Sequence, residues 1–278
     1  MRILIGLAII TLGAAAEDGA LVLENARIRL EIDPVVFSLR FLGFPGGQNF
    51  LEPHYLAERE RTAEGWLDPG GLTTDLAPFD KKDPALRRGP AEVIEHDEFH
   101  VVLLGKTSPA LGVRFKKEFR IDGADAHAYY IVTALSERAD GPNVTLRNTA
   151  RLPARSTVRV PKEDGTFTPL QEGTKAAWAI VNSKDYWLVP VPPTSPVHDL
   201  VLGGFSADAE VQNESGVWKR RIPLAPVDPG KVPGGATVLC VLDDTSRSYG
   251  LCLQGAKGTL CAATPVQFTE EWNFEKRK

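Results

Sequence analysis

Short segments in which apolar and polar residues alternate follow one another along most of this chain. Residues 113–121 (VRFKKEFRI) and 143–152 (NVTLRNTARL) show the pattern clearly, and Gly, Pro, Asn and Asp residues separate such segments. Period-two alternation bounded by turn residues is typical of half-buried β-strands, and about fifteen segments fit it. Long helices alternating with strands are missing from the pattern, which argues against a parallel α/β fold. The sequence therefore predicts an all-β protein, a large antiparallel β-sandwich.

Three segments refine this prediction. Glu24-Asn25 lies between two N-terminal alternating runs, and the pair predicts a hairpin turn there. Residues 49–64 contain the best candidate for a helix, a short one after Pro53, and residues 174–182 fit a helix or a strand equally well.

The first sixteen residues have the pattern of a secretory signal peptide. Arg2 is followed by an apolar run from Ile3 to Leu12 and by the small residues 14–16. The alternatives are a buried N-terminal strand or an uncleaved anchor. Removal of residues 1–16 leaves residues 17–278, which we expect to form a single β-sandwich domain in a secreted or periplasmic protein. No later segment approaches the about 20 apolar residues of a membrane span, so we expect none in the mature form.

Composition and missing motifs exclude several functions. A net charge of −4 argues against a non-specific nucleic-acid-binding protein, because such proteins need a basic field. We find no nucleophile elbow, zinc-protease helix or phosphate-binding loop, and no paired-glycine nucleotide motif. Asp243-Asp244 is the nearest approach to a metal cluster, but adjacent positions in a strand point apart. We therefore expect no cofactor and no metal.

The three cysteines, Cys240, Cys252 and Cys261, all lie in the last forty residues. Their spacings match neither zinc ribbons nor redox CxxC pairs, and their neighbours are apolar. Small buried core residues are the favoured interpretation, with one disulfide between adjacent strands as the alternative.

Four predicted strands each carry one polar residue within an otherwise apolar row. These residues are Lys117, Asn148, Arg220 and Glu270. A charged or amide side chain on an apolar face must be paired, or it must face a cleft. Four such cases predict a sheet whose inward face is partly a polar groove. The structural alternative is a buried ion pair between Lys117 and Glu270.

Residues 65–80 (GWLDPGGLTTDLAPFD) interrupt the strand pattern. The run Asp68-Pro69-Gly70-Gly71 is a strong turn signal, so we expect an ordered loop. A loop at the mouth of a sandwich can present ligand-contacting groups, and Trp66 and Asp75 are its candidates. Trp66, Trp218, Trp272 and Tyr130 could supply aromatic faces for a sugar ring, although core packing is the commoner use of such residues. The alternative is a crossover loop whose aspartates face water.

Two segments resemble the galactose-mutarotase-like (aldose 1-epimerase-like) superfamily, and its uncharacterised exported bacterial branch in particular. They are LVLENARIRLEIDPVVFSLRFLGFPGGQNFLEP at residues 21–53 and FKKEFRIDGADAHAYYIVTALSERADGPNVTLRNTARLPA at residues 115–154. The resemblance implies a β "supersandwich" with a carbohydrate site on its concave sheet. It also implies a late-strand Glu as general base and histidines as acids, because epimerisation needs one group to take a proton and another to give one. Glu270 matches the base, and His127 is the best acid, although it lacks the family's asparagine–histidine pattern.

We therefore expect an exported protein that binds a carbohydrate in a groove on one sheet. The predicted substrate-binding residues are Trp66, Asp75, Lys117, Asn148 and Arg220, and the predicted catalytic residues are Glu270 and His127. Two cations among them suggest an acidic sugar such as a uronate. Two alternatives remain: a sugar epimerase or other carbohydrate-modifying enzyme with Glu270 as base, and a non-catalytic envelope interaction protein.

Overall fold

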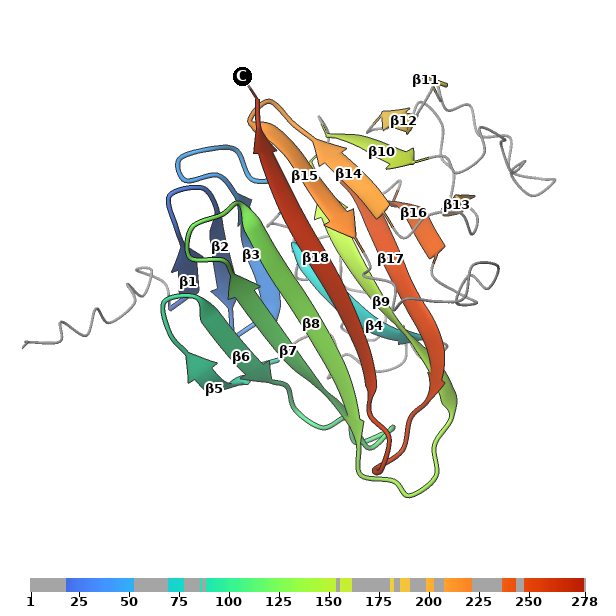
Figure 1. The fold of residues 1–278 in the computed structure, drawn as a ribbon. Coiled ribbons are helices and arrows are strands. Elements are labelled where there is room, and N and C mark those ends of the chain that lie inside the picture. The colour runs from blue at the N-terminus through green and yellow to red at the C-terminus, as the bar shows by residue number, and fades with distance from the viewer. Residues whose placement is uncertain are drawn as a thin grey trace, which may run out of the picture.

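Two antiparallel β-sheets make up the described part of the chain (Figure 1). The structure is a computed structural model. It describes residues 19–52, 70–77, 86, 89–153, 156–161, 181–182, 186–190, 199–202, 208–221, 237–243 and 248–277. These residues contain eighteen strands and no helix of a turn or more. The predicted all-β fold is confirmed. The predicted signal peptide, the helix after Pro53 and most of residues 174–182 lie outside the described residues; Val181–Asn182 is extended.

The eight-stranded sheet collects strands from both ends of the chain. In spatial order it contains β1 (Leu21–Glu24), β2 (Arg29–Asp33), β3 (Ser38–Gly43), β4 (Leu72–Ala77), β9 (Asn143–Leu152), β17 (Ser248–Thr259), β16 (Thr237–Asp243) and β13 (Asp199–Leu202). The predicted hairpin at Glu24-Asn25 is the β1–β2 turn. The C-terminal strands β13, β16 and β17 also belong to this sheet, and β17 pairs with β9 along nearly its whole length.

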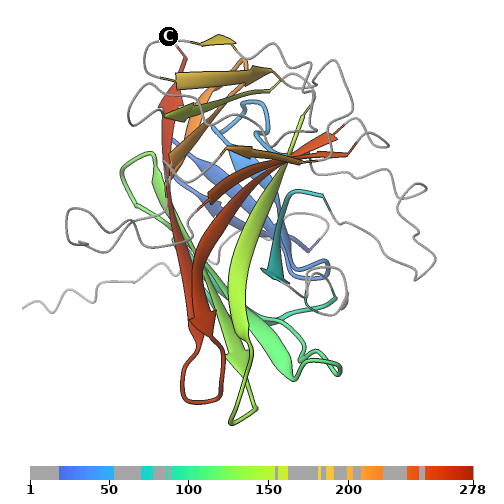
Figure 2. The same cartoon turned by 90° about the vertical axis from the view of Figure 1, so that its right-hand side faces the viewer.

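The ten-stranded sheet packs against the first one and faces the viewer in Figure 1. Its spatial order is β11 (Val181–Asn182), β12 (Tyr186–Pro190), β10 (Thr157–Pro161), β14 (Asp208–Gln212), β15 (Gly216–Arg221), β18 (Val266–Lys276), β8 (His127–Ser136), β7 (Val113–Ile121), β6 (His100–Leu104) and β5 (Glu92–His96). The view turned by 90° shows the long strands β9, β17 and β18 side by side, with β9 and β17 in one layer and β18 in the other (Figure 2).

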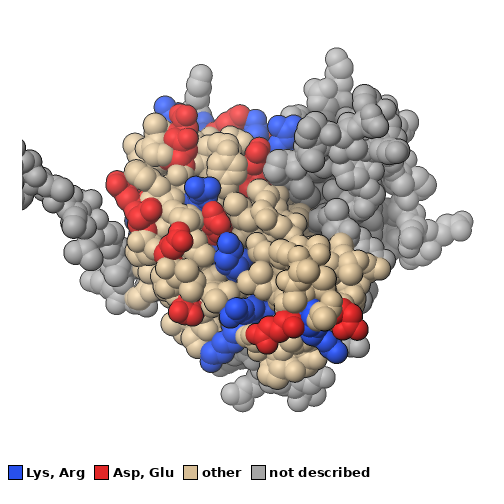
Figure 3. Space-filling model, turned by 60° about the horizontal axis from the view of Figure 1, so that its bottom comes forward, with Lys and Arg blue, Asp and Glu red and all other residues tan. Residues whose placement is uncertain are grey.

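Side-chain alternation places the core between the sheets. Along β7 and β9 every second residue is buried, and the rows Val113–Phe115–Lys117 and Val144–Leu146–Asn148 face the opposite sheet as their apolar neighbours predict. Outward residues are largely polar, and basic and acidic side chains lie interspersed on the face in Figure 3. Burial of the apolar rows is the main favourable term in holding the two sheets together.

Strand β4 corrects the prediction of a loop across residues 65–80. Leu72–Ala77 pairs residue by residue with β9, from Leu72 opposite Ala150 to Ala77 opposite Thr145. Leu72, Thr74 and Leu76 point into the core, so the segment alternates as a strand does. Turn residues on both sides of this short run concealed it. Gly71, at φ 64°, makes the turn into β4 possible, because a Cβ there would lie 2.0 Å from the carbonyl oxygen of Leu39.

Candidate functional site

A fully buried carboxylate stands at the centre of the polar groups between the sheets. Glu270, on β18, accepts four hydrogen bonds. Its Oε1 accepts from Asn148 Nδ2 at 3.0 Å and from an Arg220 terminal nitrogen at 2.7 Å. Its Oε2 accepts from Arg220 Nε at 2.8 Å and from Trp272 Nε1 at 2.9 Å. A carboxylate has about four lone-pair directions, so protein donors fill the hydrogen-bonding capacity of Glu270.

Arg220, on β15, is the cationic partner of this carboxylate. Two of its nitrogens grip Glu270 side by side, the bidentate geometry that makes arginine–carboxylate pairs strong. Its other terminal nitrogen donates to the carbonyl of Leu251 at 2.7 Å, and the first also reaches the carbonyl of Asn148 at 3.2 Å. The guanidinium carbon lies 5.0 Å from the centre of the Trp218 ring. The charge is therefore paired, hydrogen-bonded and stacked.

Two hydroxyl groups extend the same network across the sandwich. Thr74, on β4, donates to Asn148 Oδ1 at 2.9 Å and shares a 2.8 Å hydrogen bond with the hydroxyl of Tyr130, on β8. Burial raises the pKa of Tyr130, so the phenol stays protonated. These hydrogen bonds thus tie β4 and β9 of one sheet to β8, β15 and β18 of the other. We call the residues that make them the inter-sheet network: Thr74, Tyr130, Asn148, Arg220, Glu270 and Trp272.

The network brings together three of the predicted site residues but not in an open groove. Asn148, Arg220 and Glu270 converge as the alternation predicts, yet none of the three side chains is exposed to solvent. Tyr130, Trp218 and Trp272 are equally buried and belong to the core, so they offer no face to a sugar. The prediction of a polar groove is therefore wrong at this position, because the inward polar groups form hydrogen bonds with one another and leave no open space. In this geometry Glu270 has a structural task.

Lys117 lies apart from the network. Its Nζ donates to the carbonyl of Phe37 at 2.6 Å and sits 4.0 Å from the centre of the Phe37 ring. The proposed ion pair between Lys117 and Glu270 is therefore absent; Arg220 takes that place. Complete burial lowers the pKa of Lys117 to about 7, and the negative charge of Asp75 opposes part of that shift. Phe37 itself has a positive φ of 56°.

His127 and Glu270 lie on opposite faces of the ten-stranded sheet. Glu270 pairs in register with Tyr130, whose side chain points inward, while His127 pairs with Asn273 on the outward row. The His127 ring packs on Tyr129, with ring centres 4.5 Å apart. An acid and a base acting on one sugar must both reach it. These two residues cannot do so together, and the geometry does not support the predicted acid–base pair.

The outward faces of β4 and β9 carry a second group of polar side chains. Thr73 lies opposite Thr149, and Asp75 lies opposite Arg147. Arg151 continues the same row of β9. Thr73 and Asp75 are buried although they point away from the core, and the three β9 side chains are half-buried. We call Thr73, Asp75, Arg147, Thr149 and Arg151 the outer polar row. Of the predicted site residues, only Asp75 belongs to it.

Sequence reasoning overlooked parts of both groups. Thr74 was not expected in a site, and Trp272 was considered only as an aromatic face for a sugar ring. The predicted site residues did not include Arg147, Thr149 or Arg151. The sequence signal for the outer polar row was alternation: Arg147, Thr149 and Arg151 occupy every second position of one strand, and Thr73 and Asp75 occupy every second position of another. Trp66 lies outside the described residues, and its sugar-binding role stays a prediction.

The described residues contain no group of three His, Cys, Asp or Glu side chains placed to hold a metal. Cys261 is a free thiol. On the paired strands β16 and β17, Cys240 lies opposite Leu251 and Cys252 lies opposite Leu239; their side chains are not described. A search of the same residues for a helix long and apolar enough to cross a membrane finds none.

Solved structures that share this fold include several proteins whose names refer to sugars. A candidate aldose 1-epimerase from Escherichia coli K12 aligns over 93% of this chain and 99% of its own, with a TM-score of 0.60 and 9% identity. A galactose mutarotase-like protein from Lactobacillus casei aligns over 92% and 100%, with a TM-score of 0.58 and 10% identity. A GH36 α-galactosidase from Geobacillus stearothermophilus, solved with raffinose, aligns over 93% of this chain but 41% of its own, with a TM-score of 0.55 and 7% identity. No family model and no curated protein matches the sequence.

Proposed function

Because the chain has the galactose-mutarotase-like fold, we propose that it is an exported carbohydrate-binding protein that holds its sugar over the outer polar row. The observation that carries the proposal is the pairing of β4 with β9, which sets hydroxyl groups beside hydroxyl groups and a carboxylate beside a guanidinium. The half-buried Arg147, Thr149 and Arg151 can bind the hydroxyls of a sugar from one side, with the buried Thr73 and Asp75 next to them on β4. Arg147 and Arg151 favour an acidic sugar, since a guanidinium binds a carboxylate with two parallel hydrogen bonds.

The inter-sheet network supports this position from beneath. Thr74 and Asn148 alternate with Thr73, Asp75, Arg147 and Thr149 along the same two strands, on the opposite face. Their hydrogen bonds fix β4 against β9, and the backbone in turn fixes the outward side chains. Binding sites need such support, because ligand-contacting side chains that are held loosely do not keep the positions that binding requires. Asn148, Arg220 and Glu270 would then act on the sugar only indirectly.

A thermal-shift screen of the mature chain against neutral hexoses, uronates and oligosaccharides tests the proposal. A ligand that binds only the native state raises its melting temperature. We expect a shift with at least one uronate, and we expect Arg147→Gln and Thr149→Val to reduce it. Arg114→Gln is the matched control, because it removes an equal charge from an outward position on the other sheet.

The second candidate function is a non-catalytic interaction protein, and the closed interior favours it. The carboxylate predicted as the general base is fully used by protein donors. If no sugar in the screen shifts the melting temperature, carbohydrate binding is contradicted and this alternative gains. An epimerase needs a base other than Glu270 in the geometry described above.

A further inference from the structure

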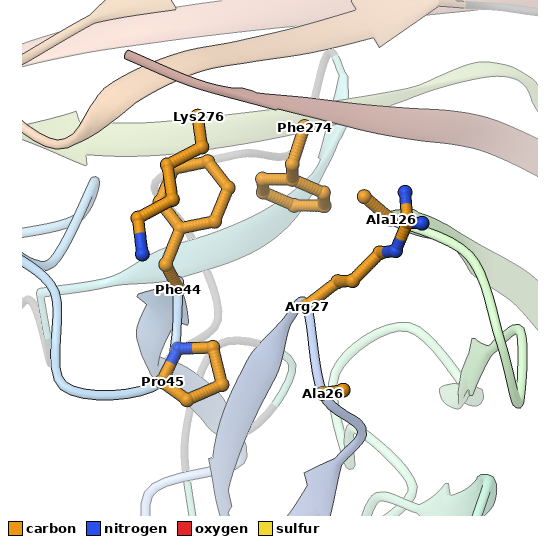
Figure 4. A pocket seen from close by; sticks show the side chains of 7 residues that line it. All are labelled: Ala26, Arg27, Phe44, Pro45, Ala126, Phe274 and Lys276. Carbon is orange, nitrogen blue, oxygen red and sulfur yellow. The ribbon is translucent and has the colours of Figure 1, made fainter. Parts of the chain in front are cut away.

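A small pocket lies at the end of the sandwich where β18 approaches the C-terminus, the upper end in Figure 1. Among the described residues it is lined by Ala26, Arg27, Phe44, Pro45, Ala126, Phe274 and Lys276 (Figure 4). Four segments supply them: the β1–β2 turn, the segment after β3, the β7–β8 turn and the end of β18. None of these residues belongs to the inter-sheet network or to the outer polar row.

The floor of this end pocket is aromatic and rigid. Phe44 and Phe274 are nearly perpendicular, at 80° with ring centres 6.3 Å apart, and both pack against Phe50 at 6.0 Å. Gly216 allows this packing, because a Cβ there would come 2.8 Å from the Phe44 ring. The floor therefore exists before any ligand arrives, which lowers the entropy cost of binding.

The walls of the pocket are fixed by hydrogen bonds between the two turns. The side-chain amide of Asn25 donates to the carbonyls of Asp122 and Asp125, and its Oδ1 accepts from the backbone N–H groups of Arg27 and Ile28. The backbone N–H of Phe274 donates to the carbonyl of Ala126. The β1–β2 turn, the β7–β8 turn and β18 thus form one hydrogen-bonded frame around the opening.

Both charged side chains of the lining are cations. Figure 4 shows Arg27 and Lys276 on opposite sides, with the two Phe rings between them. Both residues are exposed, and neither forms an ion pair with any residue that the structure describes. Among the lining residues that the structure describes, none has a carboxylate, amide or hydroxyl side chain. A neutral sugar would find no side-chain acceptor for its hydroxyl protons, whereas an anion needs only donors.

We propose that the end pocket binds a small carboxylate that carries an apolar ring. The ring would lie against Phe44 and Phe274, and the carboxylate would accept hydrogen bonds from Arg27 or Lys276. The volume of about 270 Å³ fits this class, since an apolar cavity of about 150 Å³ already takes one benzene molecule. The site is independent of the proposed sugar site, which lies on the outward face of β4 and β9.

Ligand-observed NMR titration of the full chain tests the pocket with benzoate as the probe. We expect benzoate to bind in about the millimolar range, as its few atoms allow. Benzylammonium, with the same ring and the opposite charge, should not bind. Arg27→Gln and Lys276→Gln should each weaken benzoate about threefold to fivefold, the size of an exposed ion pair, and the double variant should remove binding.

Arg114→Gln is the control for these variants. It removes the same charge seven residues from the end of β7 that leads into the β7–β8 turn, about 23 Å along the strand, and it should leave benzoate binding unchanged. If inorganic phosphate bound as tightly as benzoate, the proposed ring contact would be contradicted. If the double variant bound benzoate as tightly as the wild-type protein, the proposed site would be contradicted. Sugar binding by the double variant should be normal, so failure of either proposal can be told from failure of the other.

Discussion

At the scale of single residues, buried charge is the feature with the largest consequences. Arg220 and Glu270 compensate each other without any contact with water. Removal of one member leaves an uncompensated charge in the core, which costs about 3–5 kcal/mol. We therefore expect Arg220→Met alone, and Glu270→Gln alone, to destabilise the fold strongly. The double variant should be more stable than either single variant, because no unpaired charge then remains in the core. Urea unfolding measures all three.

Lys219, on the same strand as Arg220, provides the control for these substitutions. It pairs with Glu275 in an exposed position, where an ion pair contributes about 1 kcal/mol at most. Lys219→Gln should leave the unfolding midpoint almost unchanged. A loss as large as that of Arg220→Met would contradict the importance given to burial.

Lys117 predicts a dependence of stability on pH. Its pKa is about 7 in the folded state and about 10.4 in the unfolded chain. Between these values the unfolded state binds a proton that the native state does not, so the free energy of unfolding rises with pH, by about 1.4 kcal/mol per pH unit. Below pH 7 both states are protonated and the burial penalty is complete. Lys117→Met should remove the rise, as urea unfolding between pH 7 and about pH 9.5 would show. Parallel curves for variant and wild type would contradict the lowered pKa.

At the scale of secondary-structure elements, alternation predicted which face each side chain occupies but not what covers that face. The inward positions of Lys117, Asn148, Arg220 and Glu270 follow from period two alone. Whether an inward polar residue meets water or a partner depends on the opposite sheet, and no local pattern encodes that contact. The partner of Glu270 was therefore misassigned to Lys117. Strand β4 was missed because its six residues stand among glycines and prolines.

The entry into β4 gives a test of this element. Gly71 and Gly46 have almost the same backbone angle, φ 64° and φ 68°. A Cβ on Gly71 would meet the Leu39 carbonyl at 2.0 Å, whereas a Cβ on Gly46 would meet nothing within 4 Å. Both Ala substitutions incur the cost of a left-handed conformation, about 1 kcal/mol. Only Gly71→Ala must also move β4 away from β3, so we expect a clearly larger fall in melting temperature. Equal losses would show that β4 adjusts freely.

At the scale of the whole molecule, the inter-sheet network makes the two sheets depend on each other. Strands β9 and β18 belong to different sheets, yet Asn148 and Glu270 join them directly. A shared core and a shared hydrogen-bond network predict that both sheets open in one cooperative step. Amides at the centres of β9 and β18 should therefore have the same free energy of opening in hydrogen exchange.

Glu270→Ala turns this expectation into a comparison. The substitution lies on β18, but it removes the acceptor for Asn148 on β9 and for Arg220, whose guanidinium also holds the carbonyls of Asn148 and Leu251 on the other sheet. If the sheets open together, protection should fall by the same amount on β9 and on β18, because each amide then reports the same global equilibrium. Exchange followed by mass spectrometry resolves the two strands. Loss of protection on β18 alone would mean that each sheet is stable by itself, and the outer polar row would then lack the support that the network is proposed to give it.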